Sequence, residues 1–263
     1  MKTSYHSYTN VLNRRHIRQG DIVYVDLGKG ASYEQEGIRP CVVLQNNIGN
    51  ARSTTTIVAA LSSKIKFDKF GHLQPTHHIL DITKQIGLHK PSIILFEQIR
   101  TISKSRILDN RPVGHINLVE LSKILFNNFV FPSSHNSTLE YRQGDIVYVD
   151  LGKGIGSEQS GKAVCLIIQN NKGNKYSPVT MIVPLARFAG KRMPTHLHID
   201  STGGLRMKDP TIAMFEQMRT ISKSRIIGKL PGHVSLKQML PYIETALGLT
   251  YASTKMENCE MAY

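Results

Sequence analysis

The sequence contains no tryptophan and only three cysteines among its 263 residues. Three cysteines are too few and too badly spaced for a disulfide framework or a zinc knuckle, so we expect a reducing, cytoplasmic location. Cys41 and Cys165 occupy the same place in two similar apolar runs, which indicates small buried side chains rather than a redox pair. No apolar run approaches the roughly 20 residues that a membrane helix needs, and the N-terminal segment lacks the apolar core of a signal peptide.

Acidic residues are also scarce. The chain has 19 Asp and Glu against 33 Lys and Arg, for a formal net charge of +14 and a sequence pI near 9.7. This excess exceeds what solubility requires and favours a polyanionic partner, because lysine and arginine neutralise phosphates and release their counterions. Nucleic acid is therefore the first candidate partner.

The chain is an internal duplication. "RQGDIVYVDLGKG" occurs at residues 18–30 and again at 142–154, and "EQIRTISKSRI" at 97–107 returns as "EQMRTISKSRI" at 216–226. Each copy is about 110 residues long, the size of one compact domain. We divide the chain into an N-terminal arm (1–17), a first domain (18–130), a Ser-rich linker (131–140), a second domain (141–250) and a tail (251–263).

Short runs rich in Val, Ile, Thr and Tyr dominate each copy, and Gly, Asn, Pro or Lys bounds them, which is typical of strands. Near the end of each copy, apolar residues spaced by three and four predict an amphipathic helix, at residues 118–129 and 236–247. We therefore expect a mainly β fold with α, in which each copy is a small, strongly curved antiparallel sheet or barrel closed by one helix.

With these words in place, each copy resembles the MazF/PemK family of toxin–antitoxin ribonucleases. The first copy carries the matching words "RQGDIVYVDL", "EQEGIRP", "CVVLQN", "PTH" and "EQIRTISKSR". The resemblance implies an SH3-like barrel and a two-fold dimer, which a fused chain would form as a pseudo-dimer of its tandem copies. It also implies metal-independent cleavage of single-stranded RNA by the neighbouring 2′-hydroxyl, with no cofactor.

The resemblance implies two catalytic residues. Arg39 suits a phosphoryl transition state because a guanidinium stays charged and can hold phosphate oxygens in a bidentate fork. Aligning "GNARSTTTIVAAL" with the family pattern puts Thr55 at the place of the catalytic threonine, with Thr54 and Thr56 as register alternatives.

Six further residues are candidates for RNA binding, and each has a structural alternative. Two Glu-Gln pairs recur in both copies, which suits loop scaffolding as well as RNA contact, and the carboxylate of the later pair could accept a proton. Two adjacent asparagines shape a turn first and contact a base second. These candidates are Glu34, Gln35, Asn46, Asn47, Glu97 and Gln98. We expect no metal site, because the histidines of the two copies do not share one arrangement.

The second copy keeps the strand words but departs at both catalytic positions, with Ala163 in place of Arg39 and Val179 in place of Thr55. The arginine and threonine are thus dispensable for the barrel, and we expect only the first copy to be active. The favoured function is a sequence-selective endoribonuclease toxin, whose partners are single-stranded RNA, a cognate antitoxin and, through the toxin–antitoxin complex, operator DNA. The alternative is a non-catalytic module that binds nucleic acid or an antitoxin.

Overall fold

The computed structural model describes residues 17–80, 87–88, 90–130, 139–199 and 209–249. Copy one begins with a meander of three antiparallel strands and continues with a hairpin, a short closing strand and a helix. A six-residue helix joins the second strand to the third, and a 3₁₀ turn follows the long fifth strand. The elements are β1 (Asp21–Asp26), β2 (Ile38–Val43), α2 (Asn47–Arg52), β3 (Thr55–Ser62), β4 (His77–Leu80), β5 (Ser92–Ser103), η1 (Lys104–Arg106), β6 (Gly114–His115) and α3 (Leu118–Phe126).

Copy two repeats this order with two changes. Its closing strand is eight residues long, against two residues in copy one. The strand that corresponds to β5 is broken in two by a 3₁₀ turn at the second Glu-Gln pair. Its elements are β7 (Asp145–Asp150), β8 (Lys162–Ile167), α4 (Asn171–Tyr176), β9 (Val179–Arg187), β10 (His196–Ile199), β11 (Thr211–Met214), η3 (Phe215–Gln217), β12 (Arg219–Ser222), η4 (Lys223–Arg225), β13 (Ile226–His233) and α5 (Leu236–Leu247).

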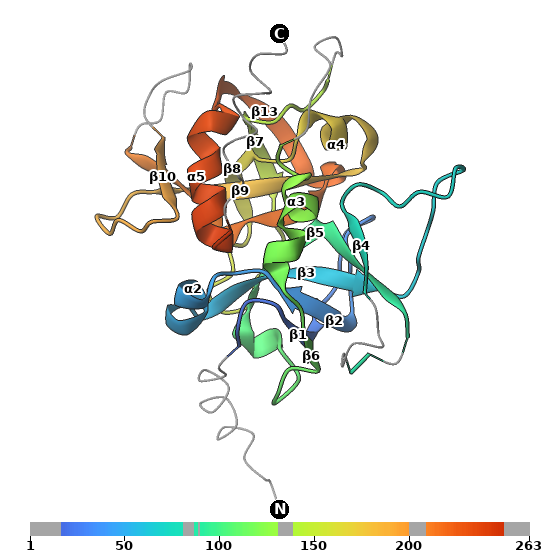
Figure 1. Ribbon diagram of the computed structural model, residues 1–263. Coiled ribbons are helices and arrows are strands. Elements are labelled where there is room, and N and C mark those ends of the chain that lie inside the picture. The colour runs from blue at the N-terminus through green and yellow to red at the C-terminus, as the bar shows by residue number, and fades with distance from the viewer. Residues whose placement is uncertain (1–16, 81–86, 89, 131–138, 200–208, 250–263) are drawn as a thin grey trace, which may run out of the picture.

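The two copies join into one sheet. β5 of copy one pairs with β12 of copy two, where Arg100 faces Arg219, and both meanders extend outward from this seam. The Thr101 hydroxyl donates a hydrogen bond to the Met218 carbonyl at 2.8 Å, and the Thr220 hydroxyl does the same to the Glu97 carbonyl at 2.8 Å. Figure 1 shows the copies stacked across this seam, copy one in blue to green and copy two in yellow to red. The tandem copies thus form a pseudo-dimer within one chain.

Successive side chains of a strand point to opposite sides of the sheet, and in each copy both sides are buried. In copy one, Val23, Cys41 and Val58 fill a small cluster inside the barrel, and Val147, Cys165 and Ile182 belong to the matching cluster of copy two. The opposite faces contribute to a larger cluster that both copies share.

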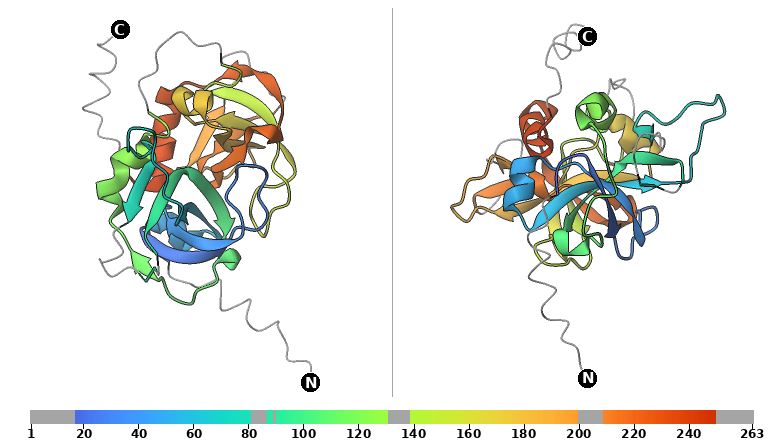
Figure 2. Two further views of the ribbon diagram at one scale, coloured as in Figure 1. Left: turned by 90° about the vertical axis from the view of Figure 1, so that its right-hand side faces the viewer. Right: turned by 60° about the horizontal axis from the view of Figure 1, so that its bottom comes forward.

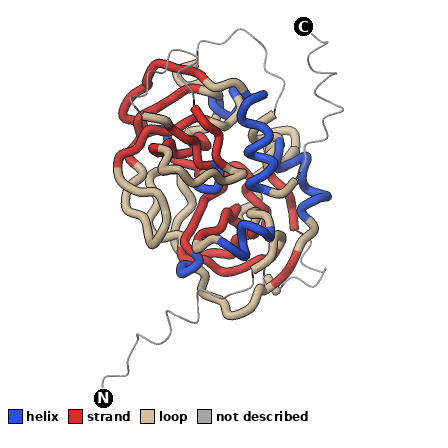
Figure 3. The backbone as a smooth tube through the Cα atoms, turned by 90° about the vertical axis from the view of Figure 1, so that its left-hand side faces the viewer, coloured by secondary structure: helices blue, strands red, loops and turns tan. Residues whose placement is uncertain are grey.

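The helices α3 and α5 lie on one side of the strands (Figure 2) and contribute buried side chains to this shared cluster. The tube in Figure 3 shows the strands gathered in two groups beside the helices. Ser235 begins α5 with a capping box to Gln238, and Gly248 ends it in the left-handed conformation at φ 61°. A Cβ on Gly248 would lie 2.6 Å from the Cβ of Asn46, so glycine here serves both the helix end and the contact between copies. In the described part of the chain, no helix is long and apolar enough to cross a membrane.

The prediction of a mainly β fold in two tandem copies is confirmed, as are the helices expected near residues 118–129 and 236–247. Pro241 lies within α5, which the helix tolerates. The expected arm (1–17), linker (131–140) and tail (251–263) lie almost entirely outside the described residues.

Candidate active site

One end of the copy-one barrel opens into a groove of about 700 Å³. The start of β2, the end of β3 and the facing parts of β4 and β5 form its walls. Basic, hydroxyl, amide and acidic side chains meet there, although they come from distant parts of the sequence. They include Arg39, Ser62, Lys64, Gln74, His77 and Glu97.

Arg39 lies on β2 at the wall of this groove and is held in place from one side. Its Nε and Nη2 donate hydrogen bonds to the Glu36 carbonyl at 2.9 and 2.7 Å, and its Nη1 donates to the Gln35 side-chain oxygen. A guanidinium has five N–H groups, so at least two remain available to a ligand. The arginine is partly exposed, so it presents a fixed positive charge to the groove.

Ser62 is the hydroxyl that lies across from Arg39. β2 and β3 are antiparallel, with Cys41 opposite Ala60, and continuing this register by two residues sets Arg39 opposite Ser62. Both side chains line the same groove. A permanent cation and a neutral hydroxyl donor therefore point into one space, which is the pair that we expected of Arg39 and Thr55.

The structure does not bring Thr55 to Arg39, so that part of the prediction is wrong. Thr55 begins the eight-residue strand that Ser62 ends, which puts roughly 20 Å of strand between them. Thr55 is 1% exposed, and its hydroxyl lies 2.9 Å from that of Ser53. Its side chain also points to the other face of β3. Thr55 lies on the face of Ile57, Ala59 and Leu61, which belong to the shared cluster, whereas Ser62 lies on the opposite face.

The two register alternatives are not in the groove either. Thr56 is buried and donates a hydrogen bond to the Asn50 side chain at 2.8 Å. The Thr54 hydroxyl donates to that of Ser157 in copy two at 2.9 Å. Both threonines therefore stabilise the local structure and the seam between the copies.

Glu97 does lie in the groove, next to two residues of the "PTH" word. Its carboxylate accepts a hydrogen bond from the Thr76 hydroxyl at 3.0 Å and lies 2.9 Å from Nε2 of His77. In copy two, Glu216 makes the same two contacts, with Thr195 and His196. The arrangement thus survives where the arginine is absent, which points to a structural role that both barrels share. Among the described residues, no group of three or more His, Cys, Asp or Glu side chains could hold a metal ion.

Gln35 and Gln98 connect the groove to the loop between β1 and β2. The Gln35 backbone N–H donates to the Gln98 side-chain oxygen at 3.3 Å, and the Gln98 side chain donates to the Tyr33 carbonyl at 3.2 Å. Gln35 in turn accepts from Arg39. These two glutamines therefore position the loop and the guanidinium, and Gln35 also lines the groove.

The remaining three candidates are not brought to the groove. Glu34 is 9% exposed and bound to Arg225 of copy two. Asn46 caps α2 and donates to the Thr245 carbonyl of copy two at 2.6 Å, and Asn47 accepts from the Gln19 N–H at 2.8 Å. These side chains hold the two copies and the local turn together, so the expected RNA contact is not supported for them.

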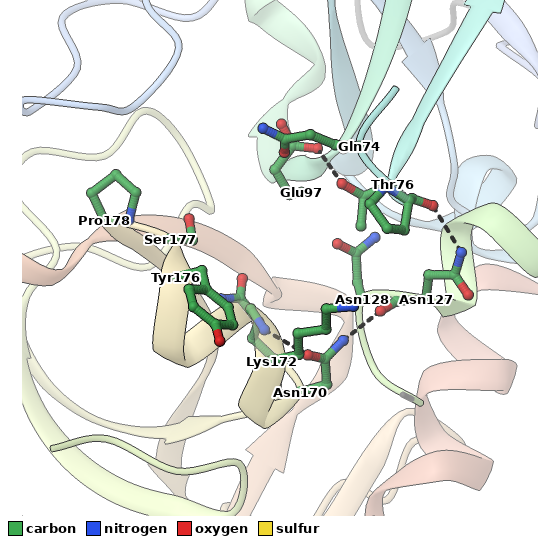
Figure 4. A pocket seen from close by; sticks show the side chains of 13 residues that line it. Gln74, Thr76, Glu97, Asn127, Asn128, Asn170, Lys172, Tyr176, Ser177 and Pro178 are labelled. Carbon is green, nitrogen blue, oxygen red and sulfur yellow. Dashed lines mark hydrogen bonds between the residues drawn. The ribbon is translucent and has the colours of Figure 1, made fainter. Parts of the chain in front are cut away.

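A second pocket of about 310 Å³ lies where the copies meet (Figure 4). Copy one contributes Gln74, Thr76 and Glu97, and copy two contributes the helix α4 with Lys172 and Tyr176. Gln74 and Glu97 also line the groove at Arg39, so the two spaces adjoin. Asn127 donates to the Pro75 carbonyl at 2.8 Å, and both residues line this second pocket.

Copy two has the same strands but neither functional group. β8 repeats the length and burial pattern of β2, and Ala163 faces Val149 as Arg39 faces Val25. The register of β8 and β9 sets Ala163 opposite Ala186, which stands where copy one has Ser62. Copy two therefore lacks both the cation and the hydroxyl, although β8 and β9 pair in the same register as β2 and β3.

Comparisons with known proteins agree with this architecture. A family model described as "PemK-like, MazF-like toxin of type II toxin-antitoxin system" matches residues 18–126 and 142–247. Endoribonuclease EndoA of Bacillus subtilis (strain 168) is 40% identical over 108 residues, covering 41% of this chain and 87% of EndoA.

Two solved structures are similar to one copy each. An endoribonuclease from a mycobacterial species, in complex with its cognate antitoxin, is 20% identical and covers 42% of this chain and 98% of its own, with a TM-score of 0.35. MazF from Deinococcus radiodurans is 16% identical and covers 43% and 99%, with a TM-score of 0.36. Because the two family matches span most of the sequence, the chain belongs to the PemK-like, MazF-like toxins of type II toxin–antitoxin systems, as a tandem duplication.

Proposed function

We propose that this chain is a toxin that cleaves single-stranded RNA as a metal-independent endoribonuclease. The observation that supports this most directly is that Arg39 and Ser62 line one groove in copy one. Copy two has alanines, Ala163 and Ala186, at the two corresponding positions. A chain that only bound RNA through charge would have no need to keep this pair together in one copy.

The proposed reaction uses the RNA's own 2′-hydroxyl as the nucleophile. The 2′-oxygen forms a bond to the adjacent phosphorus, the bond from phosphorus to the 5′-oxygen breaks, and the products are a 2′,3′-cyclic phosphate and a 5′-hydroxyl. The 2′-hydroxyl loses its proton to a base, and the departing oxygen takes up a proton. Negative charge accumulates on the non-bridging oxygens as the new bond forms.

Arg39 and Ser62 are suited to this charge. The guanidinium has free N–H groups facing the groove and is already fixed by Glu36 and Gln35, so little reorganisation is needed when charge develops. The Ser62 hydroxyl adds a second donor from the adjacent strand. The Glu97 carboxylate holds Thr76 and His77 as its counterpart does in copy two, but only in copy one does it share a groove with Arg39, where it is our candidate proton acceptor.

We further propose that each chain has one active groove, with copy two as its wall. The pocket beside α4 adjoins the groove at the seam, and Lys172 brings positive charge to it. The substrate class is single-stranded RNA, because the 2′-hydroxyl must be free to reach in-line geometry. We expect a cognate antitoxin to neutralise the toxin with an acidic segment in this basic groove, and the complex to bind operator DNA. The free thiols of Cys41 and Cys165 fit a cytoplasmic location.

The test is cleavage of a mixed-sequence RNA in EDTA by the purified chain and by its Arg39→Ala and Ser62→Ala variants. We expect the parent chain to release fragments with cyclic phosphate and 5′-hydroxyl ends. Loss of one transition-state donor should lower the rate about 100-fold or more.

Lys162→Ala is a matched control, because Lys162 is an exposed residue beside Ala163 on the corresponding strand of copy two. Its cleavage rate should equal that of the parent chain. Intact RNA that binds tightly to the parent chain and to both variants would instead favour the non-catalytic binding module. Cleavage that persists in Arg39→Ala would contradict the assigned site.

A further inference from the structure

Two phenylalanines are exposed on a loop that only copy one possesses. Phe67 is 55% exposed and Phe70 is 71% exposed. Both belong to residues 64–72, here called the 64–72 loop, which projects from the body of the molecule between β3 and β4 (Figures 1 and 2). Two exposed aromatic rings on one projecting loop form a candidate binding surface.

The loop has a defined shape at its tip. The Asp68 carboxylate accepts hydrogen bonds from the N–H groups of Phe70 and His72 at 2.8 and 2.9 Å. The Asp68 N–H donates to the His72 carbonyl at 2.8 Å, and Gly71 adopts the left-handed conformation at φ 81° that closes the turn. Because the turn is already formed, the loop loses less conformational entropy when a ligand binds to the rings.

Positive charge accompanies the rings. Lys64, Lys66 and Lys69 alternate with them along the loop, and the Lys69 ammonium lies 4.9 Å from the centre of the Phe70 ring. The only acidic side chain of the loop, Asp68, is engaged in the turn. The loop therefore combines flat apolar faces with lysines. Proteins bind single-stranded nucleic acids with this combination, because bases stack on the rings and phosphates contact the lysines.

The base of the loop lies at the candidate active site. Lys64 and Lys66 line the same groove as Arg39 and Ser62. A strand of RNA that leaves the groove along this wall would meet the two lysines first and the rings next. The loop therefore extends the groove outward from the body of the molecule.

Copy two has no equivalent of this surface. Its connection runs only from residue 188 to 195, whereas the connection in copy one runs from 63 to 76. Its one aromatic residue, Phe188, packs edge-on against His198 with ring centres 4.8 Å apart. The projecting aromatic loop and the Arg39–Ser62 pair thus occur together in one copy and are both missing from the other.

We propose that the 64–72 loop binds single-stranded RNA beyond the cleaved bond, with unpaired bases stacked on Phe67 and Phe70. This inference rests on the proposed function for the identity of the ligand as RNA. An acidic peptide would pair with the lysines but would gain little from two flat apolar faces, so the chemistry of the loop favours nucleobases. The two rings would set the length of RNA that the chain prefers.

The test measures binding of a fluorescein-labelled 2′-O-methyl RNA of about 16 nucleotides, the upper range of a single-domain binding site. This RNA cannot be cleaved by 2′-hydroxyl attack, so binding is measured independently of catalysis. Replacing both rings (Phe67→Ala with Phe70→Ala) should raise Kd about tenfold or more, because each stacked base contributes substantially to affinity. The matched change to leucine should raise it to a similar extent, and the change to tyrosine should leave it nearly unchanged.

Ile227→Ala is the control, because this apolar residue is 53% exposed on β13 of copy two, and its removal should not alter Kd. An unchanged Kd in the alanine variant, or no RNA binding by the parent chain, would overturn the inference. The inference would also be overturned if the alanine variant lost affinity for a poly-glutamate peptide but kept its affinity for RNA. That result would assign the loop to an acidic partner. Cleavage of unmodified RNA by the parent chain is scored separately. If cleavage is absent while the ring-dependent binding persists, the nuclease proposal fails and this inference stands.

Discussion

The carboxylate of Glu34 in copy one receives two hydrogen bonds from the guanidinium of Arg225 in copy two, at 2.5 and 3.0 Å. The reverse pair, Glu158 with Arg106, has distances of 2.6 and 3.0 Å. Each glutamate also accepts a backbone N–H from the other copy, from Ser222 and Ser103 respectively. The two ion pairs therefore stabilise the seam between the copies on both sides of the pseudo-two-fold axis.

Removing either carboxylate should destabilise the whole chain, because the partner guanidinium would be left buried and uncompensated. For a buried pair this costs about 3–5 kcal/mol. Glu158→Gln should cost more than Glu34→Gln, since the side chains of Arg106 and Glu158 are 7% and 3% exposed, whereas those of Arg225 and Glu34 are 18% and 5% exposed. Urea unfolding of both variants gives the comparison, and equal stability of all three proteins would contradict it.

The same pairs predict the response of stability to acid. Burial alone would raise the pKa of Glu34, but hydrogen bonds from Arg225 and Ser222 outweigh it and lower the pKa below its ordinary 4.5. Arg106 and Ser103 lower the pKa of Glu158 against the same burial. A carboxyl whose pKa is lower in the folded state contributes stability above its unfolded pKa. We therefore expect stability to fall as pH drops below 4.5, and the double Gln variant to show a flatter decline.

Thr55 and Ser62 give a direct test of the strand register. Thr55→Val removes a buried hydroxyl whose neighbour is Ser53, far from Arg39, so RNA cleavage should continue at the parent rate. Ser62→Ala removes the hydroxyl in the groove, and kcat should fall about 100-fold while the fold is unchanged. Circular dichroism controls for folding. The reverse result, with Thr55→Val inactive and Ser62→Ala active, would restore the original assignment.

Rebuilding the site in copy two should require both residues. In an Arg39→Ala background, Ala163→Arg alone should give no cleavage, because Ala186 offers no hydroxyl donor. Adding Ala186→Ser should give measurable cleavage at a rate below that of the parent chain, since the shorter β9–β10 connection cannot supply the 64–72 loop. Turnover from Ala163→Arg alone would contradict this account of the site.

The repeated words predicted the duplication, the strands and the closing helices because their signals are local. Alternation and turn residues mark strands, and three-four spacing marks α3 and α5. They also located Arg39, because an arginine retained in one barrel and absent from its twin is not needed for folding. The partner of Arg39 depended on register, which no single word contains.

Even so, the sequence held a usable signal for Ser62. In antiparallel neighbours the beginning of one strand faces the end of the next, and Arg39 lies near the beginning of β2. The residue opposite Arg39 is therefore expected at the end of β3, beyond the row of threonines at 54–56. By contrast, the pairing of Glu34 with Arg225 joins residues 191 positions apart, and no local pattern could have indicated it.

The β5–β12 seam has a consequence for how much protein is needed. Separate subunits come apart when they are scarce, but halves carried by one polypeptide meet at a local concentration that does not depend on how many molecules are present. The groove and its far wall are therefore complete in every single molecule. For the proposed nuclease, dilution in a test tube should therefore leave the turnover of each molecule the same.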